Sequence, residues 1–366
     1  MSDHRPHVSS SVAPGLTRRG LLLALPGLTL AHAALRAQAP SPAPTLRIGG
    51  LNHMTLSVSD PARSIAFYQQ LFGMPVQAHQ GATTLLRVGD GPQFIAISQA
   101  ASGTAPGINH YCVTIDDFEV ERVLRVLAAH GVSRAEGAAG GLSGGPLKVR
   151  VRMRGPEAGG APGGTPELYV GDPDGIVVQL QDARYCGGSG ALGEVCQVEP
   201  APVAGALRVR DYSHFTIFAT DAARSNAFFR DVFGAGIRSY QGPTAPTVAV
   251  GPTVEFIMFT GGGAPAPATA PRPASINHVC LNMRDFDPTA VIRTLESFGI
   301  RPRESATGPV APMRHYISMR MENRGGAKEG TPELYFTDPD GILVQLQDVR
   351  YCGGGGFLGD VCPPVA

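Results

Sequence analysis

Neither sign of charge is in excess along this chain. Lys and Arg together number 30, Asp and Glu together also number 30, and the formal net charge at pH 7 is zero. A nucleic-acid-binding domain is expected to carry a basic patch or stripe, and the sequence has no such footprint. It also has no block of like charges that would indicate an acidic or basic tail. We therefore expect no nucleic acid among its partners.

Long hydrophobic runs are also missing beyond the N-terminal segment. A transmembrane helix needs about 20 mostly apolar residues, and no stretch after residue 39 supplies them. Apolar residues nevertheless make up 43% of the 366 residues, which is enough for real cores. Because domains average roughly 150 residues, the chain has room for two. We expect no membrane insertion once the N-terminal segment is removed.

The N-terminal segment combines three features of a targeting sequence. Arg18 and Arg19 directly precede a moderately apolar run that is rich in Ala and Gly, and Ala37-Gln38-Ala39 has the small-x-small form of a cleavage site. Ala31-His32-Ala33 is the alternative cleavage site, because Pro40 follows the first directly. Residues 1–39 therefore resemble a twin-arginine export signal, which implies a periplasmic or secreted protein. Residues 40–45 then form a short extended linker. The alternative is a basic tail followed by a buried helix.

The sequence repeats itself once. Residues 165–196 and 331–362 differ at only seven of thirty-two positions, and the match continues upstream in DPARSIAFY (60–68) and DAARSNAFF (221–229). Such self-similarity is typical of a duplicated structural unit. The first copy, the linker and the second copy are predicted as residues 46–196, 197–206 and 207–362.

Each copy contains the same alternation of strands and helices twice. Residues 51–58 alternate as a strand does, and Asp60 is positioned to cap a helix that ends at Gly73. A second helix is expected at 118–130, followed by Gly131 as its stop. Further strands of the first copy are expected at 84–88, 93–98, 108–115, 148–153, 167–170 and 176–182. The pattern predicts an α+β fold in which each copy is βαβββ repeated twice.

Three motifs recur in the same order in both copies. They are an Asn-His or Ser-His strand opening, a helix that begins like DPARSIAFYQQLFG, and a DPDG turn followed by a strand with a polar residue. Together they resemble the vicinal oxygen chelate superfamily, which contains glyoxalases, bleomycin-resistance proteins and extradiol dioxygenases. The resemblance covers nearly all of residues 46–362. It implies four βαβββ modules that form two domains, each a half-open cup of strands that holds a divalent metal ion.

The resemblance also implies the metal ligands. In the superfamily they come from the first strand of each module and from the last strand, which gives His53, His110 and Gln179 in the first copy, and His214, His278 and Gln345 in the second. Strand alternation agrees, because it places His53 on the face with Thr55 and opposite Met54. The alternative is that each histidine is a structural residue, hydrogen-bonded within its strand.

Glutamine stands where the superfamily usually has glutamate. Two imidazoles and a carboxylate form the open facial triad that suits Fe(II) and oxygen chemistry. An amide oxygen is neutral, so Gln179 and Gln345 would leave one more unit of positive charge at the site and bind the metal less tightly. Glutamine does serve as a ligand in some glyoxalases. The expected cofactor is a divalent ion, Fe(II), Mn(II) or Zn(II).

Four cysteines flank equivalent glycine-rich loops near the end of each copy. In an oxidising compartment they are expected to form local disulfides, with a metal or redox role as the alternative; the pairs are Cys186 with Cys196 and Cys352 with Cys362. Cys112 and Cys280, two residues after a ligand-type histidine, are interpreted as small buried hydrophobes. Four recurring tyrosines are expected to pack, and one could act as an acid: Tyr169, Tyr185, Tyr335 and Tyr351. His315 occurs only in the second copy. If the two sites differ in activity, this histidine is one marker of the difference.

These patterns favour an exported, metal-dependent enzyme that acts on a small oxygen-bearing substrate, with an extradiol-type dioxygenase as the best match. A glyoxalase-like lyase or isomerase fits less well, because an exported protein leaves the glutathione pool. A non-enzymatic protein of the bleomycin-resistance type, which sequesters a small molecule, is the main alternative. A structural module with decayed sites is a weaker one, because all six ligand-type residues are retained.

Overall fold

The computed structural model describes residues 44–261 and 273–365. The predicted export signal (1–39) and most of the predicted linker 40–45 lie outside this part of the chain. Within the described residues, no helix is long and apolar enough to cross a membrane.

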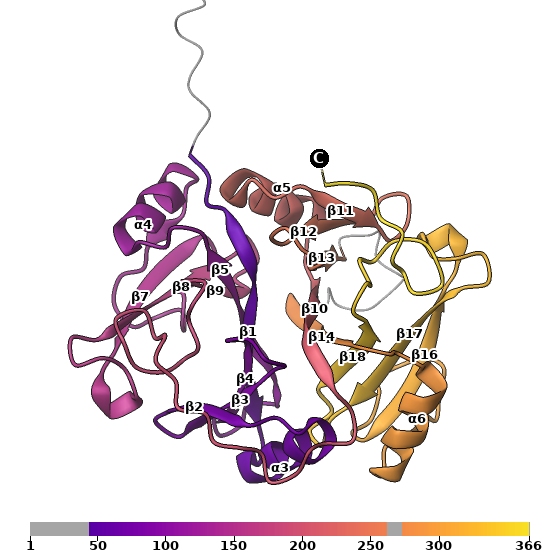
Figure 1. Cartoon of the computed structure of the whole chain (residues 1–366). Helices are drawn as coiled ribbons and strands as arrows, with labels where there is room; N and C mark the ends of the chain where they lie inside the picture. Colours follow the sequence, from indigo (N-terminus) through magenta and orange to yellow (C-terminus); the bar gives the residue numbers. More distant parts are fainter. Residues whose placement is uncertain (1–43, 262–272, 366) are drawn as a thin grey trace, which may run out of the picture. The chain divides into compact units, whose positions relative to one another are not determined.

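Two nine-stranded mixed sheets form the framework, one from each copy (Figure 1). In sheet order, the first consists of β2 (Val76–Gln80), β3 (Thr83–Arg87), β4 (Phe94–Gln99), β1 (Ile48–Val58), β5 (Gly107–Ile115), β9 (Val177–Gln181), β8 (Thr165–Gly171), β7 (Lys148–Arg154) and β6 (Ser133–Arg134). The second consists of β11 (Ile237–Tyr240), β12 (Pro246–Ala249), β13 (Phe256–Thr260), β10 (Val209–Phe218), β14 (Ser275–Met283), β18 (Leu343–Asp348), β17 (Thr331–Thr337), β16 (Arg314–Arg320) and β15 (Arg301–Pro302).

Each sheet is assembled from two modules that meet at their first strands. β1 pairs with β5 antiparallel, and the other strands of each module extend outward from this central pair. The first module is βαβββ, while the second carries one additional strand, the two-residue β6. The predicted α+β fold, with two glyoxalase-like domains in tandem, is therefore confirmed. Strands β1–β9 lie within 46–196 and β10–β18 within 207–362, and those limits stay predictions.

The four α-helices within the described residues begin at capping side chains. α3 (Pro61–Phe72) starts after Asp60, whose carboxylate accepts the Arg63 amide, and ends at Gly73 with a left-handed φ of 67°. Both boundaries agree with the sequence. The second helix, α4 (Val120–Ala129), starts two residues later than predicted, because the Glu119 carboxylate accepts the amides at the helix start. The others are α5 (Ala222–Phe233) and α6 (Pro288–Ser297), and short 3₁₀ turns occur at Pro156–Ala158 and Glu322–Arg324.

The DPDG turn fixes the start of β9 and β18, the strands that carry Gln179 and Gln345. The Asp172 side chain accepts the amide protons of Asp174 and Ile176 at 2.8 and 2.9 Å, while Gly175 adopts a left-handed φ of 82°. This is an Asx turn with glycine where a positive φ is required. Because β9 starts two residues later, the turn sets the register that places Gln179. Asp338 makes the same pair of hydrogen bonds in the second copy.

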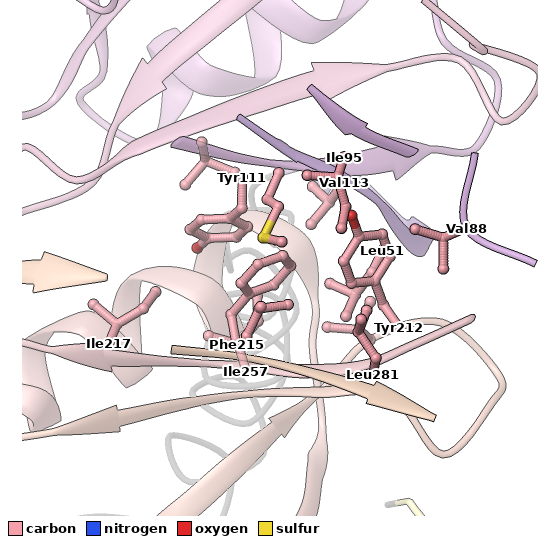
Figure 2. Packing of buried hydrophobic residues seen from close by; sticks show 14 of the residues in the cluster. Leu51, Val88, Ile95, Tyr111, Val113, Tyr212, Phe215, Ile217, Ile257 and Leu281 are labelled. Carbon is pink, nitrogen blue, oxygen red and sulfur yellow. The ribbon is translucent and has the colours of Figure 1, made fainter. Parts of the chain in front are cut away.

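One continuous hydrophobic core joins the two copies (Figure 2). The Tyr111 ring lies 4.9 Å from the Phe215 ring, and the Tyr212 hydroxyl donates to the Phe94 carbonyl at 2.6 Å. Tyr111 and Phe215 directly follow His110 and His214 and so face the opposite side of their strands, and a β-bulge between Tyr212 and His214 turns Tyr212 to that side as well. Each sheet thus buries one face against the other copy and keeps the opposite face for its cup.

The turn of each copy also contacts the first helix of the other. Arg63, at the start of α3, forms an ion pair of 2.7 Å with Asp340, and Asp340 also accepts the Ser59 amide at 3.1 Å. The reciprocal pair joins Arg224 of α5 to Asp174. Their carboxylates are almost fully buried, so the contacts connect the two domains at their ligand-bearing ends.

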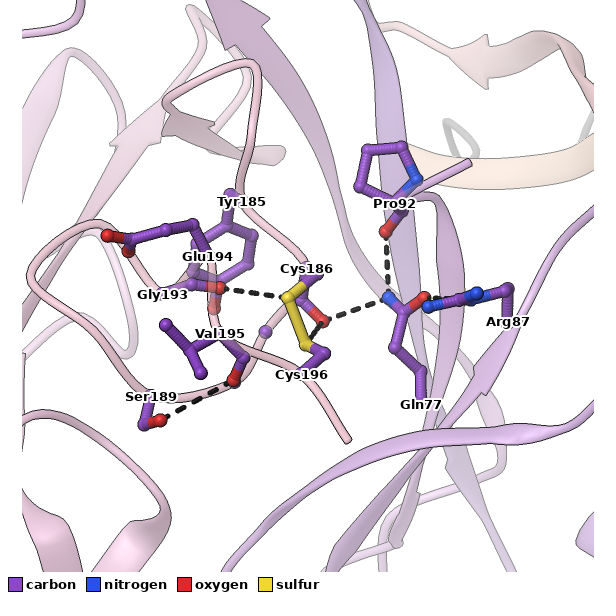
Figure 3. Close-up of a disulfide and its surroundings, with 12 residues drawn as sticks. Gln77, Arg87, Pro92, Tyr185, Cys186, Ser189, Gly193, Glu194, Val195 and Cys196 are labelled. Atoms are coloured by element: carbon purple, nitrogen blue, oxygen red, sulfur yellow. Dashed lines mark hydrogen bonds between the residues drawn. A yellow bond between two sulfur atoms is a disulfide. The ribbon is translucent and has the colours of Figure 1, made fainter. Parts of the chain in front are cut away.

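Both predicted disulfides are present in the structure. Cys186 is bonded to Cys196 and Cys352 to Cys362, with 6.3 Å between the Cα atoms of each pair. The first closes a glycine-rich loop against the β2 end of the sheet, where the Gln77 side-chain amide donates to the Cys186 carbonyl at 2.9 Å (Figure 3). Such bonds are typical of proteins from oxidising compartments.

Candidate metal centre

Three strands bring the predicted ligands of the first cup together. His53 Nε2 and His110 Nε2 each lie 3.1 Å from the Gln179 Oε1 atom. The two imidazole rings are 5.7 Å apart and nearly perpendicular. All three side chains are at least 95% buried. The residues predicted from the sequence therefore converge on one point.

Sheet register explains this convergence. Cys112 on β5 lies opposite both His53 on β1 and Gln179 on β9, so all three belong to the same row. His110 precedes Cys112 by two residues and shares its face of the sheet. Cys112 lies in the same row, fully buried, and burial raises the pKa of its thiol well above the usual value. It is a small buried residue, as predicted.

The neighbours of the histidines fix their protonation. Asn52 donates its side-chain amide to the Tyr185 carbonyl at 2.9 Å, which turns its oxygen toward His53 Nδ1 at 2.7 Å. An amide oxygen can only accept, so the proton resides on Nδ1 and the lone pair on Nε2. The Asn109 oxygen lies 2.8 Å from His110 Nδ1 in the same way. Both rings are thus presented as metal ligands are, with Nε2 facing inward.

Three lone-pair atoms consequently face one another. At neutral pH neither ring is protonated, because burial lowers the pKa of His53 well below 6.5 and that of His110 to about 4. The Thr55 hydroxyl, 3.2 Å from His110 Nε2, can donate to one lone pair. The Gln179 amide nitrogen is buried and has no hydrogen-bond partner among the described residues. A divalent cation between the three atoms would satisfy them, so the residues present fit a metal ion.

The Gln179 amide has a second arrangement with a different consequence. Rotating it by 180° exchanges its oxygen and nitrogen, which ordinary structural criteria distinguish only through their hydrogen bonds. Its NH₂ group would then donate to both Nε2 atoms and satisfy the cup without a metal. The orientation of one amide therefore separates a metal-binding cup from a metal-free one.

The second cup brings the equivalent residues together, but the surroundings of its first histidine differ. His278 Nε2 lies 3.0 Å from Gln345 Oε1, and the His278 ring is 5.5 Å from that of His214. Burial lowers the pKa of His278 to about 4. However, the His214 Nδ1 atom lies 3.1 Å from the Ser213 hydroxyl, where the first copy has an asparagine. A hydroxyl can donate or accept, so it does not fix the tautomer of His214.

A buried carboxylate that sequence reasoning missed lies beside each cup. Glu167 accepts hydrogen bonds from Arg154 Nε at 2.7 Å, from the Tyr185 hydroxyl at 2.8 Å and from the Tyr169 hydroxyl at 3.0 Å. These donors occupy it, and the described residues contain no group of three or more His, Cys, Asp or Glu placed to hold a metal. This leaves the Gln179 amide as the third candidate ligand of the cup. The second copy repeats the cluster with Arg320, Glu333, Tyr351 and Tyr335.

The tyrosines are explained by this cluster. Tyr169 packs edge-on against His110 at 5.4 Å, but its hydroxyl proton is directed at Glu167. Burial, followed by the Glu167 charge, raises its pKa well above the usual value. Tyr185 likewise donates to Glu167. Their role in the structure is to orient Glu167 and to pack against the ligand rings.

The first cup opens into a cavity of about 530 Å³. The Phe94 ring stacks on His53 at 4.3 Å and limits the ligand on one side. Thr55 and Ser57 continue the cavity wall along β1, and Arg152 reaches it from β7. His315, in contrast, belongs to neither cup, because its Nε2 lies 3.4 Å from Glu296 of α6. It therefore does not mark a difference between the two sites.

Comparisons with known proteins agree with this architecture. Residues 50–180 and 212–346 each match the family model described as Glyoxalase/Bleomycin resistance protein/Dioxygenase superfamily. Among solved structures, the Mn(II)-bound glyoxalase from Novosphingobium aromaticivorans is similar at 15% identity and a TM-score of 0.53, with 82% of each chain covered. Homoprotocatechuate 2,3-dioxygenase from Arthrobacter globiformis is similar at 18% identity and a TM-score of 0.53, with 84% of this chain and 82% of that one covered. At these identities the likeness concerns the fold.

Proposed function

We propose that this chain, which belongs to the Glyoxalase/Bleomycin resistance protein/Dioxygenase superfamily, is a metal-dependent enzyme that binds a small substrate through neighbouring oxygen atoms. The observation that carries the proposal is that His53 Nε2 and His110 Nε2 each lie 3.1 Å from the Gln179 oxygen. Asn52 strengthens it, because it leaves the inward nitrogen of His53 unprotonated.

A divalent metal held by these residues would supply Lewis-acid or oxygen-activating chemistry. The chain's own residues prepare the site for it. Asn52 and Asn109 hold the protons on the outer ring nitrogens, and Phe94 shields His53 from water by stacking on it. Since all three ligands are neutral, the ion would keep its full charge, which favours anionic oxygen donors in the substrate. An extradiol-type dioxygenase is the activity we favour, and the likeness in fold to homoprotocatechuate 2,3-dioxygenase supports it.

We further propose that the protein acts outside the cytoplasm. The two disulfides support this, because such bonds persist in oxidising compartments. The twin-arginine pattern before residue 39 points to the same location. That route carries folded proteins and would allow the metal to be loaded before export.

The second candidate is a protein that sequesters a small molecule without a metal. The observation that favours it is the unpartnered amide nitrogen of Gln179, since a rotated amide would satisfy both histidines. A glyoxalase-like lyase or isomerase is the alternative enzymatic activity.

Elemental analysis of the purified protein tests the proposal. The wild type is compared with His110→Ala, His278→Ala and the double variant, with His79→Ala as a control, because His79 is exposed on β2. We expect at least one equivalent of Fe, Mn or Zn, reduced by the cup variants and unchanged in the control. Turnover of a catechol should stop on chelation and return with the metal. Metal-free protein that cannot be loaded, with intact ligand binding, would overturn the proposal in favour of the sequestering protein.

A further inference from the structure

The two cups contain the same types of candidate metal ligand. They differ in the side chains of the wall above these residues. In the first copy Arg152 lies on β7, opposite Glu167 of β8, and lines the cavity. Its guanidinium lies 5.9 Å from the centre of the Tyr169 ring, which itself contacts His110. Arg152 is thus an exposed cation beside the Tyr169 ring, which in turn packs against the candidate ligand His110.

Arg152 is not neutralised by the protein. No carboxylate lies within ion-pair distance of it among residues 44–261 and 273–365. The neighbouring Arg154, in contrast, is buried and bonded to Glu167 at 2.7 Å. Glu157 also lines the cavity, but it forms no ion pair with Arg152. The charge of Arg152 is therefore available to a bound molecule.

The second cup lacks this cation. Ser318 on β16 lies opposite Glu333 of β17, which is the position that Arg152 has in the first copy. Two residues earlier, Tyr316 stacks on Tyr335 at 4.9 Å, and the Arg303 guanidinium covers Tyr316 at 4.6 Å. Tyr316 and Ser318 thus stand where β7 carries Arg150 and Arg152, while Arg320 keeps the place of Arg154.

The floors of the cups differ in the same direction. We call the cup face of β1 and β4, and of β10 and β13 in the second copy, the floor of the cup. On each floor, two cross-strand pairs come after the pair that contains the histidine, which is His53–Phe94 or His214–Phe256. They are Thr55–Ala96 and Ser57–Ser98 in the first copy, and Thr216–Met258 and Phe218–Thr260 in the second. Small and hydroxyl-bearing side chains therefore line the first floor, while methionine and phenylalanine enter the second. The floor of the first cup is therefore the more polar of the two.

We propose that the first cup takes a substrate that carries a carboxylate in addition to its two metal-binding oxygens, and that Arg152 binds this carboxylate. This inference rests on the proposed function only in that a metal ion binds the two vicinal oxygens. A guanidinium offers two parallel N–H donors that match a carboxylate, and its planar group remains charged at every relevant pH. In the second cup Ser318 stands in the place of this arginine, and the nearest guanidinium, that of Arg303, faces the Tyr316 ring, so we expect no comparable selection for a carboxylate there. The duplication thus combines two cups of different specificity in one chain.

Calorimetric binding of two probes tests the inference. The probes are 3,4-dihydroxybenzoate and catechol, which share the vicinal oxygens and differ in the carboxylate. Zn(II)-loaded protein is used, because Zn(II) has no redox chemistry that would consume the probes. His278→Ala leaves the first cup to be read alone, and His110→Ala leaves the second.

In the first cup we expect 3,4-dihydroxybenzoate to bind at least about tenfold more tightly than catechol, the usual range for a charge-assisted hydrogen bond. Arg152→Ser, which copies the second cup, should bring the ratio near one, and Arg152→Lys should retain part of it. In the second cup the ratio should be near one, and Ser318→Arg should raise it. Thermal unfolding checks that each variant is folded.

A ratio that Arg152→Ser leaves unchanged would overturn the inference, as would an equal carboxylate preference in the second cup. Metal content is measured on the same samples, so the two proposals fail separately. If the protein holds no metal, the proposed function fails. The ratio is then measured on the metal-free protein, where its loss in Arg152→Ser supports the Arg152 assignment and its persistence contradicts it.

Discussion

His53 donates its Nδ1 proton to the side-chain oxygen of Asn52 over 2.7 Å. Asn52 is itself held by the Tyr185 carbonyl, which precedes the disulfide-bonded Cys186. A loop closed by sulfur therefore determines which nitrogen of a candidate metal ligand is free. Residues behind the ligands commonly control metal affinity in this way.

Replacing Asn52 should weaken the first cup selectively. Asn52→Ser copies Ser213 of the second copy and removes the acceptor that fixes the His53 tautomer. We expect the metal affinity of the first cup to fall by about tenfold or more, measured by competition with a chelating dye. Ser213→Asn is the matched variant and should strengthen the second cup. Equal affinities in all variants would show that the tautomer is not controlled here.

Restoring a carboxylate should strengthen metal binding. Gln179→Glu adds a negative charge 3.1 Å from both Nε2 atoms and removes the amide that could satisfy them without a metal. The metal affinity should rise by about tenfold or more, because the ion is attracted by a full charge in a buried site. Gln345→Glu should act equally in the second cup. Gln181→Glu, on the same strand but bonded to the Pro166 carbonyl, is the control and should give no such gain.

Stability should fall as the pH rises, owing to a carboxyl group between the domains. Glu255 is only 6% exposed and accepts the Leu51 amide at 2.7 Å. Burial, opposed by this hydrogen bond, raises its pKa to about 8. A folded-state pKa above the unfolded value of 4.5 means that the folded protein binds the proton more tightly. The group therefore stabilises the fold less and less between about pH 4.5 and 8.

Glu255→Gln should flatten this dependence. The difference between mutant and wild type should grow to a few kcal/mol, ~3 to 5, at alkaline pH, in favour of the mutant. It is measured by denaturant unfolding across the pH range. Glu329→Gln, at an exposed position, is the control and should leave the profile as it is. Parallel profiles for wild type and Glu255→Gln would contradict the raised pKa.

Reduction of the first disulfide should affect both stability and metal binding. The bond joins residues 10 apart, and a loop of this size stabilises the fold by about 2 to 3 kcal/mol in the chain-entropy model. Releasing it also frees the Tyr185 carbonyl that holds Asn52. A Cys186→Ala/Cys196→Ala variant should therefore unfold earlier and bind metal more weakly in the first cup. Cys352→Ala/Cys362→Ala should lose similar stability and leave metal binding in the first cup unchanged. If both variants lose stability and neither loses metal affinity in the first cup, the disulfide does not act on that cup through Asn52.

Local chemistry made much of the fold predictable from the sequence. Asp60 and Gly73 bound a helix because a carboxylate satisfies free amides and glycine accepts a positive φ. His53 and His110 were placed by strand alternation together with the superfamily resemblance. β2 (Val76–Gln80) was missed, since its partner is the hairpin strand β3 and, beyond the copy's end, Glu199. No local sequence pattern predicts the pairing of Val76 with Glu199.

Long-range polar contacts were beyond sequence reasoning. Glu167 resembles a surface residue of a strand until Arg154 and Tyr185, 13 and 18 residues away, are seen to surround it. The Arg63–Asp340 pair joins residues 277 positions apart. Their proximity depends on the docking of two domains, and no spacing within one copy encodes it.

The reciprocal pairs Arg63–Asp340 and Arg224–Asp174 have a consequence for the symmetry of the molecule. Each turn leads into the strand that carries a glutamine of one cup, while its carboxylate is satisfied by the helix of the other copy. A single copy would leave an arginine and an aspartate unpaired at the same time, and these two groups are complementary to those of a second identical copy. Two identical copies related by a twofold axis would satisfy both groups at once, as the two copies of this chain do for each other.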